Sequence, residues 1–396
     1  MSKIVSSYYV LSVIFQVPMK VEDKSSKQME ATSEKVVAAC KLADPYHSKT
    51  LQKPFPSGLL YQELDNNAIK LTGASPNDGS IDASLSFLPQ SDQLELLDCC
   101  NGLVLCRYES SSTPDTYHYV VCNPATRQWT TLPETDPEQK DFQYLEKLAF
   151  NPSWSPNFYV FNFQQMCSPS AETNGVSAVR IFSSENWTWV VDDQWRPKND
   201  INVTSRPHFL LRGMLYVHTA DDRVLEMKVF HQTEQTNHRV IELPGYRASC
   251  PYDDFLYGCL GQSSGILHYA KPEIDGRKIQ VWGLEQGGWD LKHSFNISAA
   301  FGRYNFVQYD IEGFLCCDYD IQIVDLERGF IFLRDCIENK LLSYSMSTGM
   351  LTKIQDGFNR YMSFVPFYEI IRVESVAADE GTHRTDQHRY KRSIRP

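Results

Sequence analysis

The sequence has no apolar run long enough to cross a membrane and no excess of positive charge. A membrane-spanning helix needs about 18 or more apolar residues in succession. The most apolar terminal stretch, residues 4–17, is interrupted by Ser6, Ser7, Ser12 and Gln16, and no small-residue cleavage site follows it. The formal net charge is -11, whereas a nucleic-acid-binding surface is basic. We therefore predict a soluble protein with no membrane or nucleic-acid partner.

Cysteine pairs with the spacing of a zinc or redox site are also missing. The chain has 11 cysteines but no CxxC motif. Several of them lie inside apolar, strand-like runs: Cys106, Cys122, Cys259, Cys316 and Cys317. We interpret them as reduced, buried and unreactive thiols of a cytoplasmic or nuclear protein. A disulfide framework is the alternative.

Several motifs that mark common catalytic sites are absent. There is no HExxH, no P-loop and no GxGxxG after a strand. His208, His218 and His268 lie in or beside strand-like runs, and we interpret them as interior or rim residues in preference to metal ligands. Three acidic pairs are interpreted as solvated turns, with a glycosidase cleft as the alternative: Asp192-Asp193, Asp221-Asp222 and Asp253-Asp254. We predict no enzyme activity, no cofactor and no metal, and the sequence singles out no partner-binding residue.

Short apolar runs separated by turn residues fill the chain from about Phe55 to Val373. Aromatic residues, which favour strands, make up 12% of the sequence, and no long stretch has a 3.6-residue period. The runs recur in a unit that begins with a glycine, at Gly102, Gly213, Gly265 and Gly329. This spacing is typical of kelch-like repeats of roughly 50 residues.

The repeat predicts an all-β fold, a β-propeller of about six four-stranded blades. A β-sandwich is the structural alternative. We expect glycine at the start of each unit to allow a sharp turn near the propeller axis. The run Tyr361–Ile371 is predicted to pair with an early strand and close the ring. Trp129, at the end of the clearest unit, is predicted to be buried between blades.

One composite motif resembles a known family. It comprises Asp98-Cys99-Cys100-Asn101-Gly102-Leu103-Val104-Leu105-Cys106, then Val121-Cys122-Asn123-Pro124-Ala125-Thr126-Arg127-Gln128-Trp129, then Leu132-Pro133. This looks like the hallmark of the F-box-associated domain of plant F-box proteins. The resemblance implies a propeller that binds the protein substrate of a Skp–cullin–F-box ubiquitin ligase. A stand-alone propeller binding protein, or a kelch-type or glycosidase-type propeller enzyme, are the alternatives.

The N-terminal region resembles the family only in part. Ala39-Cys40-Lys41-Leu42-Ala43-Asp44-Pro45-Tyr46 is similar to the end of an F-box, but the leucine-rich helical pattern upstream is missing. We therefore predict an irregular or helical N-terminal segment with a remnant F-box at 1–43. An F-box-associated propeller at 44–373 and a disordered tail at 374–396 follow. A protein substrate is the expected partner, and we expect weak or no binding to the Skp-type adaptor because the F-box is incomplete.

Overall fold

The computed structural model describes residues 58–371, except 73–80, 114, 136–137, 140, 167–174, 193–194, 196–200, 230–237, 246–253, 256–257, 310–314 and 358. The predicted N-terminal segment at 1–43 and the predicted tail at 374–396 lie outside the described residues. Within these residues nearly all regular structure is β, and no helix has the length and apolar character needed to cross a membrane. The predicted all-β class is confirmed.

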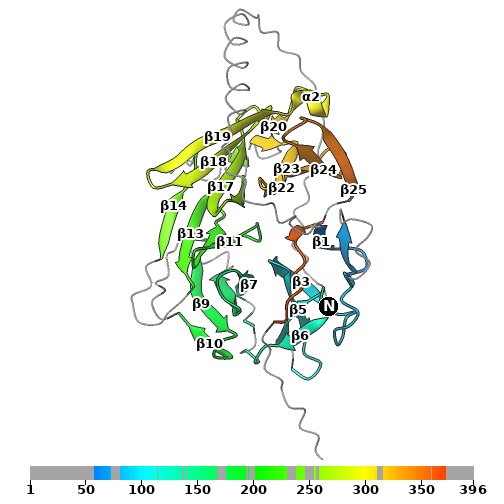
Figure 1. The fold of residues 1–396 in the computed structure, drawn as a ribbon, viewed down its shortest axis with the longest axis vertical. Helices are drawn as coiled ribbons and strands as arrows, with labels where there is room; N and C mark the ends of the chain where they lie inside the picture. Colours follow the sequence, from blue (N-terminus) through cyan, green and yellow to red (C-terminus); the bar gives the residue numbers. More distant parts are fainter. Residues whose placement is uncertain are drawn as a thin grey trace, which may run out of the picture.

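Six antiparallel units of three or four strands are arranged around one axis (Figure 1). Blade one contains β26 (Tyr361–Phe364), β1 (Gly58–Gln62) and β2 (Ile69–Thr72). Blade two contains β3 (Glu95–Cys100), β4 (Leu103–Glu109), β5 (Tyr117–Asn123) and β6 (Gln128–Thr131). Blade three contains β7 (Phe142–Phe150), β8 (Phe158–Met166), β9 (Val176–Ser183) and β10 (Thr188–Val191).

The second half of the ring follows the same plan. Blade four contains β11 (Phe209–Leu211), β12 (Met214–His218), β13 (Arg223–Lys228) and β14 (Arg239–Glu242). Blade five contains β16 (Cys259–Ser263), β17 (Ile266–Pro272), β18 (Lys278–Glu285) and β19 (Gly288–Asn296). Blade six contains β22 (Tyr319–Asp325), β23 (Phe330–Asp335), β24 (Lys340–Ser345) and β25 (Leu351–Asp356).

The ring closes on itself. The innermost strands β26, β3, β7, β11, β16 and β22 contact one another in that order, and β22 contacts β26 in turn. Between blades five and six this contact includes a parallel pairing of Gly261 with Val324. Such a closed ring protects strand edges that would otherwise pair with other molecules. The sandwich alternative is wrong, because two packed sheets would not produce this cyclic order.

The ends of the described chain meet in blade one. β26 pairs antiparallel with β1, with Gly58 opposite Phe364 and Tyr61 opposite Tyr361. The C-terminal strand therefore supplies the inner strand of a blade whose other strands come from the N-terminal side. The prediction that Tyr361–Ile371 pairs with an early strand is confirmed for β26.

The repeated glycines lie in the turns between the first and second strands of their blades. Asn101-Gly102, Arg212-Gly213 and Ser264-Gly265 each place two successive residues at positive φ. Two positive φ values in a two-residue hairpin are the signature of a type I′ turn, which matches the twist of the flanking strands. The predicted unit therefore starts one strand late, because it begins at the second strand of each blade.

Each face between neighbouring blades is filled by one apolar cluster. Three clusters lie between blades one and two, two and three, and three and four. Three further clusters join blades four, five, six and one. Because most blades are covered on both sides, Leu103, Val104, Leu105 and Cys106 in β4 are buried in succession, without alternation.

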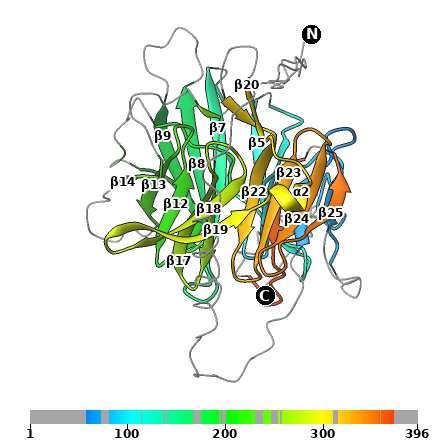
Figure 2. The same ribbon diagram turned by 90° about the horizontal axis from the view of Figure 1, so that it is seen from above.

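A small structured region lies in the connections between blades. α2 (Ser298–Phe301) and β20 (Val307–Tyr309) precede β21 (Leu315–Cys317) on the way from blade five to blade six, and β21 pairs in parallel with β15 (Asp254–Phe255). In an antiparallel four-stranded blade, all connections between blades emerge on one face of the ring. We call this face the entry face; in Figure 2 it is the side on which β20 lies.

The prediction for Trp129 is wrong. Its side chain is 40% exposed on the outer strand β6. The corresponding tryptophans of blades three and five both bond to the preceding blade. Trp189 Nε1 donates to Pro133 O, just beyond β6, at 3.0 Å. Trp289 Nε1 donates to Glu242 O, in β14, at 2.9 Å. Blade one, which precedes Trp129, has three strands in the described residues and offers no outer strand there.

The described cysteines are all free. Burial raises the pKa of the Cys100 and Cys259 thiols to about 12. A thiol that stays protonated at neutral pH is a poor nucleophile and a poor metal ligand. Cys106, Cys122 and Cys259 are buried as predicted, whereas Cys316 and Cys317 are half-buried and Cys336 is exposed.

Candidate functional site

The inner strands surround a central cavity of about 180 Å³. Its wall comes from β3, β11, β16, β22 and β26 and the residues next to them. The charged and histidine side chains of the lining are Asp98, Arg206, His208, Asp325, Glu327, Arg328 and Arg360. Sequence reasoning did not find this set, because its members come from four blades and share no local motif.

Asp98 and His208 connect the inner strands of blades two, three and four. The carboxylate of Asp98 accepts a hydrogen bond from Leu148 N at 2.6 Å, and His208 Nε2 lies 2.7 Å from Leu148 O. The same nitrogen lies 3.5 Å from Asp98 Oδ2. Burial lowers the pKa of the His208 imidazole, so the ring is neutral and donates to the carbonyl oxygen. His208 is thus a satisfied interior residue.

Two cations extend this polar core. Lys147 is fully buried, and its Nζ donates to Arg206 O at 2.9 Å. Burial lowers the pKa of Lys147 to about 8. Arg206 donates from Nη1 to Gly258 O at 2.6 Å, and its Nη2 lies 3.3 Å from Asp320 Oδ1. These contacts join blades three to six around the axis.

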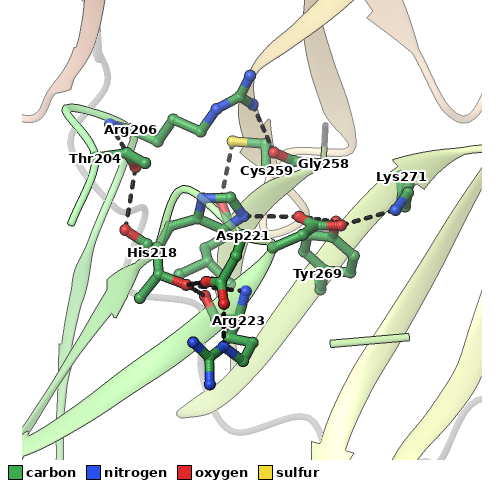
Figure 3. Close-up of polar contacts among 12 residues, drawn as sticks. Thr204, Arg206, His218, Asp221, Arg223, Gly258, Cys259, Tyr269 and Lys271 are labelled. Carbon is green, nitrogen blue, oxygen red and sulfur yellow. Dashed lines mark hydrogen bonds and ion pairs between the residues drawn. The ribbon is translucent and has the colours of Figure 1, made fainter. Parts of the chain in front are cut away.

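A second buried network joins blades four and five (Figure 3). Asp222 Oδ1 lies 3.0 Å from His218 Nε2 and accepts from Tyr269 OH at 2.6 Å. Lys271 Nζ donates to Asp222 Oδ2 at 2.7 Å. Burial favours the neutral acid, but the hydrogen bond from His218 and the charge of Lys271 hold the pKa of Asp222 well below its usual range. His218 is fully buried, and the network joins the two blades at their interface.

The motif that resembles the F-box-associated domain binds the end of the chain's own propeller. We call residues 365–371, which follow β26, the C-terminal strap; Figure 1 shows it running from β26 toward β6. Asn123 Nδ2 donates to Phe367 O at 2.7 Å, and Gln128 Oε1 accepts from Ile371 N at 3.0 Å. A Cβ atom at Gly102 would lie 2.6 Å from Phe367 Cβ. The motif therefore fixes the strap to blade two.

Four large apolar side chains are exposed together on the entry face. Ile274, Tyr304, Tyr309 and Ile337 are between 60% and 74% exposed. They lie in the β17–β18 turn, in the connection that follows α2, and in the β23–β24 turn. We call these four residues the α2 surface. Sequence reasoning missed it, because exposed apolar residues in loops have no distinctive pattern.

The segments that carry the α2 surface are tied to one another. Arg277 Nε donates to Tyr304 O at 3.0 Å, and Arg303 forms an ion pair with Asp335 at 3.2 Å. Gly276 has no room for a Cβ atom, because Phe306 Cβ would lie 2.5 Å away. Phe306 in turn packs edge-on against the buried Tyr319. The exposed side chains are therefore held on a rigid base.

Comparison with known proteins identifies the family. The family described as "F-box protein At3g26010-like, beta-propeller" matches residues 77–365. This chain belongs to that family. No curated protein matches the chain. The resemblance to F-box proteins, drawn from the Asn-Gly and Asn-Pro motifs, is therefore confirmed for the propeller.

Solved structures with a similar arrangement of strands come from several kinds of protein. A mutant of the Aleuria aurantia lectin in complex with alpha-methyl-L-fucoside is 8% identical, with a TM-score of 0.40 over 76% of this chain and 92% of that one. A protein from Lactobacillus plantarum is 9% identical, with a TM-score of 0.36 over 78% and 99%. The GH93 alpha-L-arabinofuranosidase of Fusarium graminearum is 11% identical, with a TM-score of 0.32 over 70% and 82%.

In this F-box-family propeller the acidic pairs are not uniformly solvated turns. Asp222 is buried in the network described above, and Asp192 is buried with Oδ2 3.0 Å from His238 Nε2. Asp221 accepts from Thr219 Oγ1 at 2.5 Å and pairs with Arg223. The interpretation as solvated turns is therefore wrong for Asp192 and Asp222, whose partners come from distant parts of the sequence. Asp193 and Asp253 lie outside the described residues.

The three histidines singled out in the sequence do not lie together at one site. His268 Nδ1 lies 3.0 Å from Ile266 O in blade five, while His208 and His218 belong to separate networks. Across the described ranges no group of three or more His, Cys, Asp or Glu residues is placed to hold a metal ion. The polar groups of the ring described above serve to join blades.

Proposed function

We propose that this chain is a protein-interaction module resembling the substrate-recognition part of an F-box protein in a Skp–cullin–F-box ubiquitin ligase, and that it binds its target protein through the α2 surface. The observation that carries the proposal is the exposure of Ile274, Tyr304, Tyr309 and Ile337 on adjoining, well-supported segments. Membership of an F-box propeller family supports a protein partner. The net charge of -11 favours a protein over a nucleic acid.

The composition of the α2 surface fits a protein interface. Tyrosine is enriched among the residues that dominate binding energy, and arginine is enriched at interfaces. Tyr304 follows Arg303 directly, and its backbone oxygen accepts from Arg277; the side chains of these two arginines already hold the loops in place. Binding therefore orders few additional side chains, which reduces the entropic cost of association.

Residues 1–43 decide whether the bound target reaches a ligase. We propose that they form a remnant F-box, that 44–373 form the propeller domain and that 374–396 form a disordered tail. An adaptor-binding F-box needs an apolar helical face, and Val36, Val37, Cys40 and Leu42 supply few apolar positions. The alternative form of the proposal is thus a stand-alone binding protein of the cytoplasm or nucleus that binds targets without delivering them to a ligase.

The target-binding proposal is tested with surface variants. Cross-linking of the full chain in cells identifies target candidates, and isothermal titration with each purified candidate then measures affinity. We expect the Tyr304→Ala, Tyr309→Ala double variant to weaken binding at least tenfold. The matched control is Val190→Ala with Leu291→Ala, since these residues are also exposed but lie on the outer strands β10 and β19. Equal loss in both double variants would rule out the α2 surface.

Docking of the chain to a ligase is tested separately, by its binding to the adaptor. The full chain and a variant starting at Asp44 are each co-purified with a Skp-type adaptor. We expect weak binding or none in both cases. Stoichiometric binding that is lost in the shorter variant would establish a working F-box and overturn the stand-alone form of the proposal.

A further inference from the structure

Among the described residues that line the central cavity, one cation has no hydrogen-bond or ion-pair partner in the described part of the chain. Arg360 lines the cavity directly before the inner strand β26, and the residue is exposed. Its guanidinium makes no hydrogen bond or ion pair with any residue that the structure describes. The other lining cations are engaged: Arg206 with Gly258 O and Asp320, and Arg328 with Asp325 at 2.9 Å.

The carboxylates within electrostatic range of Arg360 are bound elsewhere. These are Asp98, Glu146 and Glu95. Asp98 accepts from Leu148 N at 2.6 Å, Glu146 from Tyr119 OH at 2.8 Å, and Glu95 from Arg107 Nε at 2.7 Å. Each therefore already has a strong hydrogen-bond donor. The donors of the Arg360 fork remain available to a ligand that enters the cavity.

A second cation makes the site more favourable for an anion. The charge of Arg360 lowers the pKa of the buried Lys147, as burial does more strongly, so the two groups repel each other. Of the two, Lys147 donates to Arg206 O, whereas the N–H groups of Arg360 have no acceptor among the described residues. An anion next to Arg360 would offset this repulsion.

We propose that the central cavity binds a carboxylate group through the guanidinium of Arg360. The planar fork of arginine matches the two oxygens of a carboxylate in a bidentate pair. A volume of about 180 Å³ corresponds to roughly six water molecules at about 30 Å³ each, enough for a small carboxylate or for the end of a peptide. This site is separate from the α2 surface and does not depend on the ligase role.

The experiment measures binding of acetate to the full chain. Line broadening of the acetate methyl resonance in NMR reports binding directly, and chloride keeps the ionic strength constant. We expect saturable binding by the natural chain and at least tenfold weaker binding by Arg360→Gln. The control Arg239→Gln, on the outer strand β14, is expected to bind as the natural chain does. Absence of saturable binding, or equal binding by Arg360→Gln, would overturn the proposal.

Further variants and probes make each outcome decisive. Arg360→Lys retains the charge but loses the fork; we expect it to weaken binding several-fold, and unchanged affinity would overturn the bidentate assignment. Inorganic phosphate that binds when acetate does not would also overturn the carboxylate assignment. A tripeptide with a free C-terminal carboxylate, compared with its amide, distinguishes a peptide end from a free small carboxylate as the source.

Discussion

The side-chain amide of Asn123 donates a hydrogen bond of 2.7 Å to the carbonyl oxygen of Phe367 and connects the third strand of blade two to the C-terminal strap. The same nitrogen lies 3.3 Å from Glu369 O, and Asn123 Oδ1 accepts from Ala125 N at 3.1 Å. Asn123 is fully buried. One side chain thus shapes the Asn-Pro turn and fixes the segment that leaves the closing strand.

We predict that Asn123→Ala lowers the free energy of unfolding by about 1–3 kcal/mol, because it removes the buried donor to the carbonyl oxygen of the half-buried Phe367 and the acceptor of Ala125 N. Urea unfolding followed by tryptophan fluorescence measures the change. Gln308→Ala is the control, since Gln308 is exposed on β20 and should cost less than about 0.5 kcal/mol. An effect of Asn123→Ala no larger than that of the control would show that the strap does not depend on this residue.

Gly102 and Gly265 occupy equivalent turns but differ in their surroundings. Both have positive φ, 88° and 72°. A Cβ at Gly102 would meet the strap at 2.6 Å, whereas nothing lies within 4 Å of a Cβ at Gly265. We predict that Gly265→Ala costs about 1–2 kcal/mol from backbone strain alone, and that Gly102→Ala costs clearly more. Thermal unfolding of the two variants measures the difference, and equal losses would show that the strap is not packed on the turn.

Trp189 and Trp129 occupy the same position on the outer strands of blades three and two. Trp189 packs in the cluster between blades two and three and donates to Pro133 O, while Trp129 is 40% exposed. We predict that Trp189→Ala costs about 2–4 kcal/mol and that Trp129→Ala costs about 1 kcal/mol. Denaturant unfolding of both variants provides the comparison. A larger loss for Trp129→Ala would restore the assignment of that residue to a blade interface.

The two tryptophans also show which features of the structure can be predicted from the sequence and which cannot. The Asn-Gly and Ser-Gly turns are local signals, so the blades and their approximate number follow from the sequence. The environment of Trp129 depends on whether the preceding blade has an outer strand, and that blade is assembled from both ends of the described chain. Asp222 is similar, because its burial depends on Tyr269 and Lys271 in the next blade. Arg360 belongs to a cavity that five blades build together.

Glu138 and Glu146 share the same donors between blades two and three. Tyr119 OH lies 2.8 Å from Glu146 Oε1 and 3.3 Å from Glu138 Oε1, and Arg107 Nη1 lies 3.0 Å from Glu138. Burial, aided by the charge of Glu146, raises the pKa of Glu138 to about 7 against the opposing effect of Arg107. The pKa of Glu146 is also raised, chiefly by burial. Two such close acids titrate as a pair.

This pair predicts a dependence of stability on pH. Because the pKa of Glu138 is raised from its ordinary value of 4.5 to about 7, the folded chain binds more protons than the unfolded chain between these values. The stabilisation is therefore fully present below about pH 4.5 and is lost as the pH rises through about 7. Glu138→Gln removes the titrating group and keeps an acceptor for Arg107 and Tyr119. We expect this variant to unfold at higher denaturant concentration than the natural chain at pH 8 and to show a smaller decline between pH 5 and 8. Glu109→Gln, exposed at the end of β4, is expected to retain the natural decline, and the same slope in Glu138→Gln would assign the titration to other groups.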